Sequence, residues 1–312
     1  MKNNYLKNKV ALVSGSSMGI GKAIAWELVQ QGAKVILNGR DHEKLLRIKN
    51  DFSTNGFKVK SVIADIRDQD ECKFLVEQTI SIYGQLDILV NNAGMSSRGS
   101  IEHSADKNFT ILSETNFTGA AHLSKYAIPF LKETKGHVVF INSVAGLRGM
   151  PFNSAYSASK MAQAALSEAL RIELYDFGIH VGIAFVGFTQ NDPDKKILDV
   201  DGSLVYLPKR NNLRLATAES VAKSIRIMIE KRKKRITLTG LGNLANFIFR
   251  YFPIFSNWLI WLNREKIKSQ YTMIGGKKVI EIAQVNNQYQ EIITGVEGKV
   301  KTVLKSPNIK TY

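Results

Sequence analysis

Short runs rich in Val and Ile recur along the first 240 residues, separated by segments long enough to hold a helix. The runs are Val10–Val13, Val35–Leu37, Val59–Ile63, Ile88–Val90, Val138–Ile141 and Ile179–Val186. Continuous apolar runs of this length are typical of strands buried on both faces, and their alternation with helices predicts a parallel sheet. Right-handed crossovers then give an α/β doubly wound fold of Rossmann type, with ligands at the carboxyl ends of the strands.

A cluster of glycines joins the first of these strands to the helical pattern that follows. Glycines at such a junction let the backbone turn tightly and approach a ligand, and the free N–H groups of a helix N-terminus suit a pyrophosphate. A glycine cluster alone is weak evidence, but between a first strand and a first helix it indicates a dinucleotide site. The residues expected to contact a cofactor here are Gly15, Ser17, Gly19, Ile20 and Gly21.

The end of the second strand, Asn38-Gly39-Arg40, bears on the choice of cofactor. A carboxylate here would bind a ribose 2′-hydroxyl, and none stands before Asp41. Arg40 could instead pair with a 2′-phosphate through charge-assisted hydrogen bonds. Asn38 and Arg40 therefore predict that NADP(H) is preferred and NAD(H) is the alternative. The competing interpretation of Arg40 is an exposed loop arginine.

Tyr156 and Lys160 stand four residues apart, which puts both side chains on one face of a helix. The Lys160 ammonium would favour the tyrosinate over the phenol, whose ordinary pKa is about 10. Tyr156 is therefore a candidate general acid for carbonyl reduction and general base for alcohol oxidation. Ser143, after the fifth strand, can donate from its hydroxyl to a substrate carbonyl and hold it beside Tyr156.

Together these motifs make the chain similar to the short-chain dehydrogenase/reductase family over roughly residues 5–240. The family's Thr-Gly-x-x-x-Gly-x-Gly matches Ser14–Gly21, with Ser14 in place of Thr; Asn-Asn-Ala-Gly matches Asn91–Gly94, and Tyr-x-x-x-Lys matches Tyr156–Lys160. The resemblance implies a metal-free, NADP(H)-dependent oxidoreductase that interconverts a ketone or aldehyde and an alcohol. An apolar, lipid-like carbonyl is the favoured substrate, and 3-oxoacyl thioesters or simple aldehydes and ketones are the alternatives.

The resemblance also assigns further residues. It implies that Asn116 helps to hold a water chain leading from Lys160 to solvent, and that Asp65 contacts the adenine amine. One departure is that the family usually has Pro-Gly after the sixth strand, where this chain has Val186-Gly187. The cofactor contacts implied beyond the glycine cluster are Asp65, Ile66, Asn92, Ala93, Gly94, Tyr156, Lys160, Gly187 and Thr189.

Composition divides the chain into a catalytic domain, residues 1–240, and two further segments. Within that domain, residues 188–213 have a loop-like composition and are expected to form a substrate lid. Residues 241–268 are an apolar, aromatic-rich extension, which we expect to form short helices broken at Pro253 rather than a transmembrane span. Residues 269–312 form a strand-prone tail to which the sequence assigns no role.

The net charge of +16 lies mostly in the C-terminal part of the chain. Residues 1–190 carry 21 Lys and Arg against 17 Asp and Glu, whereas residues 191–312 carry 22 against 10. This excess, with the aromatics of 241–262, indicates a peripheral contact with an anionic membrane surface. The alternative is a solvated basic surface over aromatics packed on the protein or a partner. Motifs for nucleic acid are missing, so binding to DNA or RNA is not expected.

Location and assembly follow from less specific features. Cys72 is the single cysteine, which suits a reducing compartment, and Met1–Lys9 has no apolar stretch typical of a secretory signal, so we expect a cytoplasmic protein. The resemblance implies a homodimer or homotetramer built on small residues of two helices, and a cofactor-binding scaffold without turnover is the alternative from another class. The small residues are Ala120, Ala121, Ala162, Ala164 and Ala165.

Overall fold

The computed structural model describes residues 5–190, 192–206, 215–271, 273–274 and 277–278. The chain divides into two compact units, Met1–Tyr271 and Thr272–Tyr312. In the second unit the described residues form an antiparallel pair, β10 (Met273–Ile274) and β11 (Lys277–Lys278). Residues 269–271 of the tail predicted to be strand-prone are helical instead, and the tail beyond them, apart from this strand pair, lies outside the described residues.

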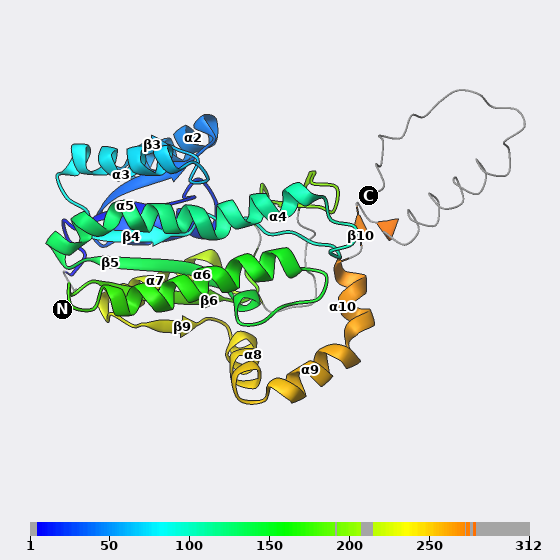
Figure 1. The fold of residues 1–312 in the computed structure, drawn as a ribbon. Coiled ribbons are helices and arrows are strands. Elements are labelled where there is room, and N and C mark those ends of the chain that lie inside the picture. The colour runs from blue at the N-terminus through cyan, green and yellow to red at the C-terminus, as the bar shows by residue number, and fades with distance from the viewer. Residues whose placement is uncertain (1–4, 191, 207–214, 272, 275–276, 279–312) are drawn as a thin grey trace, which may run out of the picture. The chain divides into compact units, whose positions relative to one another are not determined.

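Seven parallel strands form the central sheet of the first unit, in the order β3-β2-β1-β4-β5-β6-β9 (Figure 1). The strand order reverses between β1 and β4, and parallel sheets bind ligands beyond the strand ends at such a point. The predicted doubly wound fold is thus confirmed. The strands are β1 (Val10–Val13), β2 (Lys34–Gly39), β3 (Lys60–Ile63), β4 (Ile88–Asn91), β5 (His137–Ser143), β6 (His180–Val186) and β9 (Arg235–Thr237).

Helices cover both faces of this sheet and bury an apolar layer on each. On α7, for example, the Thr217 hydroxyl oxygen accepts the Ser220 N–H and caps the helix, which turns Val221, Ile225 and Met228 into the core. One face holds α1 (Gly19–Gln30), α2 (His42–Thr54) and α7 (Ala218–Glu230); the other holds α3 (Gln69–Tyr83), α5 (Gly119–Thr134) and α6 (Ser154–Glu173).

The helix α4 (Asp106–Ser113) runs into α5 through a π-helical turn, Glu114–Thr118. Such turns are rare within α-helices and often mark functional sites, because they re-aim the residues they carry. This turn carries Asn116, whose side chain has no exposed surface. The turn therefore directs Asn116 into the protein.

The segment expected to be an irregular lid contains a short hairpin, β7 (Lys196–Leu198) with β8 (Leu204–Tyr206). Arg98 and Asp199 form a buried ion pair of 2.8 Å that fixes this hairpin to the loop after β4. The Ala105 N–H also donates to the Val200 carbonyl, at 2.7 Å. The loop-like composition did not predict this hairpin, because its contact between Arg98 and Asp199 spans 101 residues and leaves no local sequence pattern.

Three helices follow the sheet: α8 (Gly240–Tyr251), α9 (Pro253–Leu262) and α10 (Arg264–Tyr271). The α9 helix begins at Pro253, where the sequence predicts a break, because proline fits the first turn of a helix and not its interior. Among the described residues, no helix is both long and apolar enough to cross a bilayer.

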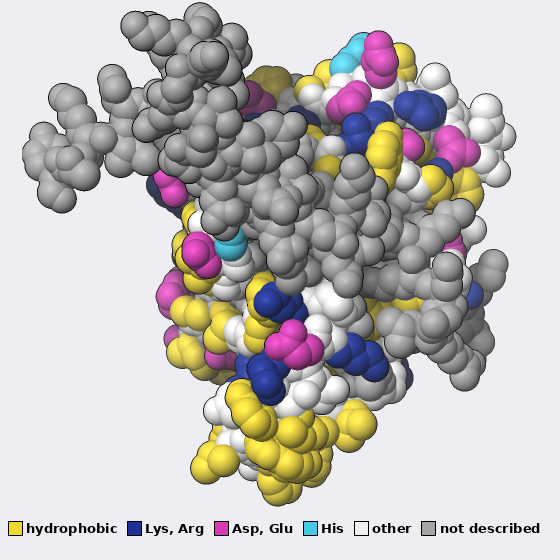
Figure 2. Space-filling model, turned by 90° about the vertical axis from the view of Figure 1, so that its right-hand side faces the viewer, with side chains coloured by type: hydrophobic (Ala, Val, Ile, Leu, Met, Phe, Trp, Pro, Cys, Tyr) yellow, Lys and Arg dark blue, Asp and Glu magenta, His cyan; other side chains and the backbone are white. Residues whose placement is uncertain are grey.

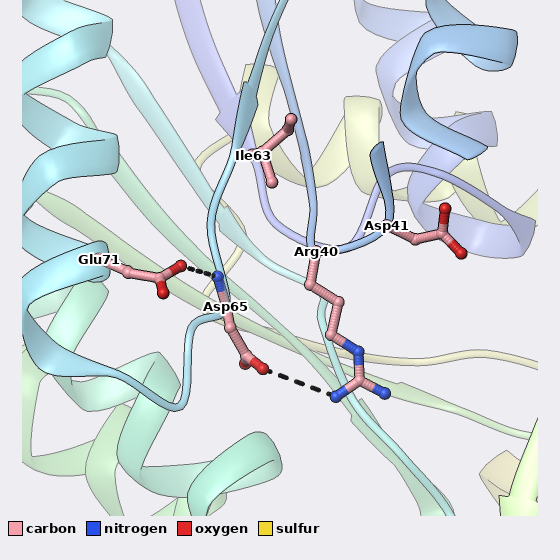
Figure 3. A pocket seen from close by; sticks show the side chains of 5 residues that line it. All are labelled: Arg40, Asp41, Ile63, Asp65 and Glu71. Atoms are coloured by element: carbon pink, nitrogen blue, oxygen red, sulfur yellow. Dashed lines mark hydrogen bonds and ion pairs between the residues drawn. The ribbon is translucent and has the colours of Figure 1, made fainter. Parts of the chain in front are cut away.

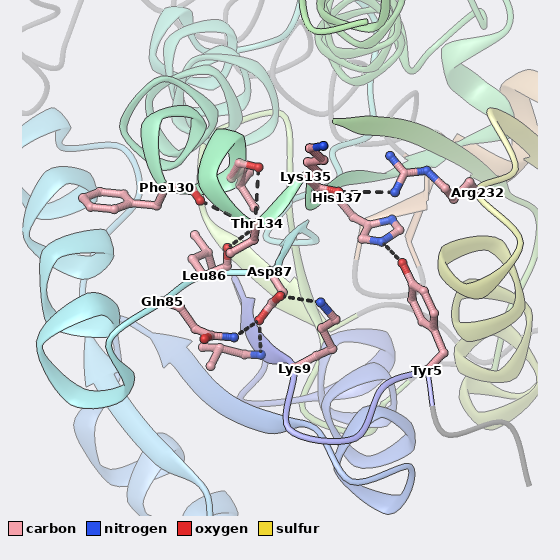
Figure 4. Close-up of polar contacts among 12 residues, drawn as sticks. Tyr5, Lys9, Gln85, Leu86, Asp87, Phe130, Thr134, Lys135, His137 and Arg232 are labelled. Carbon is pink, nitrogen blue, oxygen red and sulfur yellow. Dashed lines mark hydrogen bonds and ion pairs between the residues drawn. The ribbon is translucent and has the colours of Figure 1, made fainter. Parts of the chain in front are cut away.

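A buried polar chain closes the amino-terminal end of the sheet. Tyr5 Oη lies 2.6 Å from His137 Nε2, His137 Nδ1 lies 2.9 Å from His180 Nδ1, and His180 Nε2 lies 2.9 Å from the Lys233 carbonyl; Figure 4 shows the first of these contacts. The carbonyl can only accept, so His180 carries its proton on Nε2, and His137 donates from Nδ1. Both imidazoles are therefore neutral in this chain.

This chain predicts acid lability. Burial lowers the pKa of His137 to about 3 and that of His180 to about 4, and neighbouring positive charges act in the same direction. Below the ordinary histidine value of 6.5, the unfolded chain then binds more protons than the native one. Stability is expected to be complete above that pH and to fall as the pH drops toward 4.

His180→Gln provides the comparison, because glutamine can donate to Lys233 and accept from His137 without titrating. Urea unfolding between pH 7 and pH 4.5 should show a smaller fall in stability for this variant, by about one proton of linkage. The same pH dependence in both proteins would contradict the assignment.

Candidate active site

The glycine turn after β1 is tied to the end of β4. The Ser14 hydroxyl oxygen accepts the N–H groups of Asn92 and Ala93, both at 3.0 Å, and the Asn92 amide donates to the carbonyls of Ser14 and Gly15. A Cβ on Gly21 would lie 2.3 Å from both Asn92 Nδ2 and the Gly15 carbonyl oxygen, so no larger residue fits there. These contacts leave the main chain at the start of α1 uncovered by side chains, as a phosphate site requires.

Asn38 supports this turn from within. Its side chain is buried, and its amide nitrogen donates to the carbonyls of Val62 and Ala64. The Gly15 N–H donates to its amide oxygen at 3.4 Å. That Asn38 touches a cofactor stays a prediction, but its amide is already engaged in holding the ends of three strands together.

Asp192 contacts the N-terminus of α1. Its carboxylate accepts the Gly19 N–H at 2.8 Å and the Asp194 N–H at 3.1 Å. Gly19 has a positive φ of 53°, which points this N–H out of the turn. A carboxylate thus holds a backbone donor of the kind that a pyrophosphate would use, and an incoming phosphate must displace it.

A cavity of about 570 Å³ opens beside the end of β2, lined by Arg40, Asp41, Ile63, Asp65 and Glu71 (Figure 3). The half-exposed Arg40 guanidinium lies 3.7 Å from the Asp65 carboxylate, which also pairs with Arg67 at 2.6 Å. Burial acts to raise the pKa of Asp65, but the hydrogen bonds and charge of Arg67, with the charge of Arg40, outweigh it and lower that pKa. Asp65 is therefore a neutralised anion, and Arg40 faces open solvent.

Lys160 is almost wholly buried on α6. Its ammonium donates to the Ile141 carbonyl at 3.0 Å and to Gln163 Oε1 at 3.3 Å. Burial lowers the pKa of Lys160 from 10.5 to about 7, and the positive charge of Lys195 acts in the same direction. A lysine that titrates near neutral pH at a strand edge is typical of a reaction centre rather than of a structural ion pair.

Asn116 lies next to Lys160. Its amide nitrogen donates to the Met95 carbonyl at 2.9 Å and its oxygen accepts the Met95 N–H at 2.8 Å. A Cβ on Gly94 would lie 3.0 Å from Asn116 Oδ1 and 3.4 Å from Lys160 Nζ. The Asn-Asn-Ala-Gly segment, the π-helical turn and α6 thus meet at one point.

Ser143 ends β5, and its hydroxyl oxygen accepts the Ala145 N–H at 3.2 Å. The following turn packs on α6 because Gly146 has no side chain: a Cβ there would lie 2.1 Å from Asn142 Oδ1 and 3.0 Å from the Lys160 carbonyl. Tyr156 is partly exposed, one helical turn before Lys160. The structure therefore places Ser143, Tyr156 and Lys160 at the same edge of the sheet.

The end of β6 borders this edge as well. Val186 stands opposite Ser143 in the strand register, and Thr189 pairs with Ala216 in an isolated bridge. A Cβ on Gly187 would lie 2.4 Å from the Thr239 hydroxyl, which caps α8. The C-terminal helices thus start directly at the site.

Comparison with known proteins agrees with this geometry. A family model described as short chain dehydrogenase matches residues 9–200. The chain belongs to the short-chain dehydrogenase/reductase family. It is accordingly a nicotinamide-dependent oxidoreductase acting on CH–OH donors, and the predicted enzyme class is confirmed.

Individual relatives extend the match along the chain. The dehydrogenase/reductase SDR family member 7B of Xenopus laevis is 32% identical over 244 residues, which is 76% of each chain. The 11-beta-hydroxysteroid dehydrogenase-like 4A of Arabidopsis thaliana is 36% identical over 192 residues, or 61% of this chain and 64% of that protein. A crystal structure of a short-chain dehydrogenase from Streptomyces avermitilis superposes with a TM-score of 0.69 at 26% identity, covering 83% of this chain and 98% of that one.

Within this short-chain dehydrogenase fold, the sequence did not single out three residues that the structure places at the site. They are Gln163 beside Lys160, Asp192 on the glycine turn and Arg98 under the hairpin. Gln163 alone left a local sign, a polar residue three positions after Lys160 on the same helix face. The other two depend on contacts between distant segments.

Proposed function

We propose that this protein reduces an apolar, lipid-like ketone or aldehyde with NADPH, and that Tyr156 gives the proton to the substrate oxygen. The observation that carries this is the buried Lys160 one turn after Tyr156 and beside the strand end that holds Ser143. No apolar core needs a lysine there, and burial is costly without a function.

The residues at the crevice fit a dinucleotide. The glycine turn offers bare backbone and N–H groups for the pyrophosphate, and Arg40 and Asp65 line an open cavity for the adenosine end. In the glycine turn, the residues expected to contact the cofactor are Gly15, Ser17, Gly19, Ile20 and Gly21. Along the strand ends, they are Asn92, Ala93, Gly94, Gly187 and Thr189. When bound, the reduced nicotinamide supplies a hydride.

The protein's own residues supply the rest of the reaction. Ser143 donates a hydrogen bond to the carbonyl oxygen and orients it. Tyr156 donates its proton to that oxygen as negative charge develops, and the Lys160 ammonium lowers the free energy of the resulting tyrosinate. Asn116 keeps the loop after β4 against this group through its two bonds to Met95.

Arg40 supports NADP(H) over NAD(H). It is half-exposed at the cavity, and its contact with Asp65 at 3.7 Å is loose. The Arg67 pair neutralises Asp65, so the Arg40 guanidinium can pair with a 2′-phosphate, although the carboxylates of Asp41 and Glu71 also line the cavity.

The apolar substrate class rests on the C-terminal helices. The Arg148 side chain bonds Ser256, which links the loop after Ser143 to α9. The name of the Arabidopsis relative refers to a hydroxysteroid, which is an apolar substrate of this kind. Helices that start beside Gly187 and contact Arg148 would give such a substrate an apolar border.

We also propose that α8 and α9 touch an anionic membrane surface. Figure 2 shows hydrophobic side chains gathered at the lower end of the molecule, where these helices lie. About half or more of each of these side chains is exposed: Phe247, Tyr251, Ile254, Trp258 and Trp261. Arg250 lies on α8, and Arg264, Lys266 and Lys268 lie on α10, which follows α9. Aromatic rings favour the membrane interface, and cations favour anionic headgroups.

The basic run Lys231–Arg235 contributes less to this surface than its sequence suggests. Arg232 donates to the carbonyls of Lys135 and Gly178, and Arg235 donates to Asn246. These two cations stabilise the protein itself.

The cytoplasmic location stays a prediction.

Flotation with phosphatidylserine vesicles at low salt tests the membrane proposal. Wild type should float, and replacing both Trp258 and Trp261 by Ser should abolish flotation because the interfacial rings are lost. Tyr175→Ser, at an exposed aromatic after α6, is the matched control and should float as wild type does. If the wild-type protein does not float with the vesicles, the membrane proposal is wrong, and these aromatics belong to a lid or a protein interface.

We further propose a homodimer or homotetramer in which α5 and α6 pack against their copies. The face of α6 carries the exposed residues Met161, Ala165 and Ile172, the last 76% exposed. An isologous two-fold contact would cover them. A monomeric mass by light scattering at micromolar concentration would contradict this.

Tyr156→Phe tests the catalytic proposal. The ring stays and only the transferable proton is lost, so turnover should fall by about 10²-fold or more while NADPH binding stays within several-fold. Lys160→Ala should lower both, because its ammonium would also reach the nicotinamide ribose. Activity of Tyr156→Phe within several-fold of that of the wild type would contradict the mechanism.

Arg40→Ala tests the cofactor preference. Loss of the guanidinium should raise the apparent constant for NADPH about 10-fold or more and leave that for NADH nearly unchanged. Arg47→Ala, on the exposed side of α2, removes the same charge away from the cavity and should change neither. Equal use of NADPH and NADH by the wild type would defeat the claim.

A further inference from the structure

Gln163 is a fully buried polar side chain that lies three positions after Lys160 on α6. Its amide oxygen accepts two hydrogen bonds, from Lys160 Nζ at 3.3 Å and from Asn142 Nδ2 at 3.0 Å. Its amide nitrogen donates to the main-chain carbonyl of Asn116 at 2.8 Å. One side chain thus connects β5, α6 and the π-helical turn.

We propose that Gln163 is a positioning residue for Lys160, which holds the lysine ammonium in place through a protein bridge to the Asn116 carbonyl. The inference rests on the proposed function of Lys160. In the family resemblance, Asn116 helps to hold a water chain that leads from the lysine to solvent. Here a side chain of the protein itself joins Lys160 to the carbonyl of Asn116.

The geometry fixes which way each group faces. An amide can accept at its oxygen and donate at its nitrogen, and both ends of Gln163 have partners. Its orientation is therefore set: the oxygen must face Lys160 and Asn142, because the Asn116 carbonyl can only accept. Asn142 also donates to the Lys160 carbonyl at 2.8 Å, so it braces the backbone as well as the bridge.

The bridge leaves Lys160 part of its donor capacity. An ammonium has three N–H groups, of which Ile141 and Gln163 take two. Among the contacts of the described residues, the third is left to act toward Tyr156 and the cofactor. Because Gln163 is itself held by Asn142 and Asn116, the ammonium is preorganised, and preorganised charge is effective in catalysis.

The bridge also favours the charged form of Lys160. Burial and the charge of Lys195 oppose that form, whereas an oxygen acceptor stabilises it. Gln163→Leu removes the acceptor and should shift the alkaline limb of kcat/KM to lower pH by about one unit. Gln163→Glu puts a carboxylate at the same place and should shift that limb to higher pH.

The experiment is the pH profile of kcat/KM for NADPH oxidation, with the best carbonyl from a panel of ketones and aldehydes. Opposite shifts for the Leu and Glu variants, with the KM for the carbonyl changed less than kcat, are the expected result. Ser167→Ala is the matched control: Ser167 is equally buried one turn further on, but its hydroxyl donates within the helix, to Ala164. Its profile should match that of wild type.

Gln163→Met fills the same space without an acceptor and serves as the apolar variant if Gln163→Leu fails to fold. The pH dependence of NADPH binding, followed by its fluorescence, gives a second readout that needs no turnover. An alkaline limb that stays in place in both the apolar and Glu variants, in an enzyme that still depends on Tyr156, would overturn the inference. The loss of Tyr156 dependence would instead overturn the proposed function.

Discussion

Burying the Lys160 ammonium is the constraint on which the rest of this site depends. A buried cation is stable only where acceptors replace its water, and here the Ile141 carbonyl and the Gln163 amide do so. Each acceptor is itself held: Ile141 by the β5–β6 ladder, and Gln163 by Asn116 and Asn142. The π-helical turn, the absence of a side chain at Gly94 and Gly146, and the strand order together bring these groups to one point.

The glycine turn is also built around a charged group, but there the protein supplies hydrogen-bond donors for an anion. Its main-chain N–H groups are the donors expected to bind a pyrophosphate. The Ser14 hydroxyl and the Asn92 amide hold this part of the main chain against β4. The Asp192 carboxylate bonds the Gly19 N–H there. This bond makes the turn compact, and a pyrophosphate must replace it. The buried Arg98–Asp199 pair holds the neighbouring hairpin.

The sequence was informative where function depends on local pattern. Apolar runs located six of the seven strands, because strands buried on both faces must be continuously apolar, whereas β9 is only partly buried. The residues Ser143, Tyr156 and Lys160 could be predicted as a catalytic set because spacing on a strand end and a helix face is local. Gln163, Asp192 and the hairpin were not, because each depends on which distant segments meet. The cofactor contact of Asn38 stays a prediction, and the sequence did not indicate that its amide also donates to Val62 and Ala64.

The central claim is that a hydride moves between NADPH and a carbonyl at this strand edge while Tyr156 supplies the proton. NADPH carrying deuterium at the transferable position, incubated with the full chain and a panel of long-chain 3-keto amines, steroids, 3-oxoacyl thioesters and simple aldehydes, measures this directly. The account predicts deuterium on the carbinol carbon of at least one product, and almost none with Tyr156→Phe. Tight NADPH binding without deuterium transfer to any of these carbonyls would contradict it and favour a scaffold without turnover.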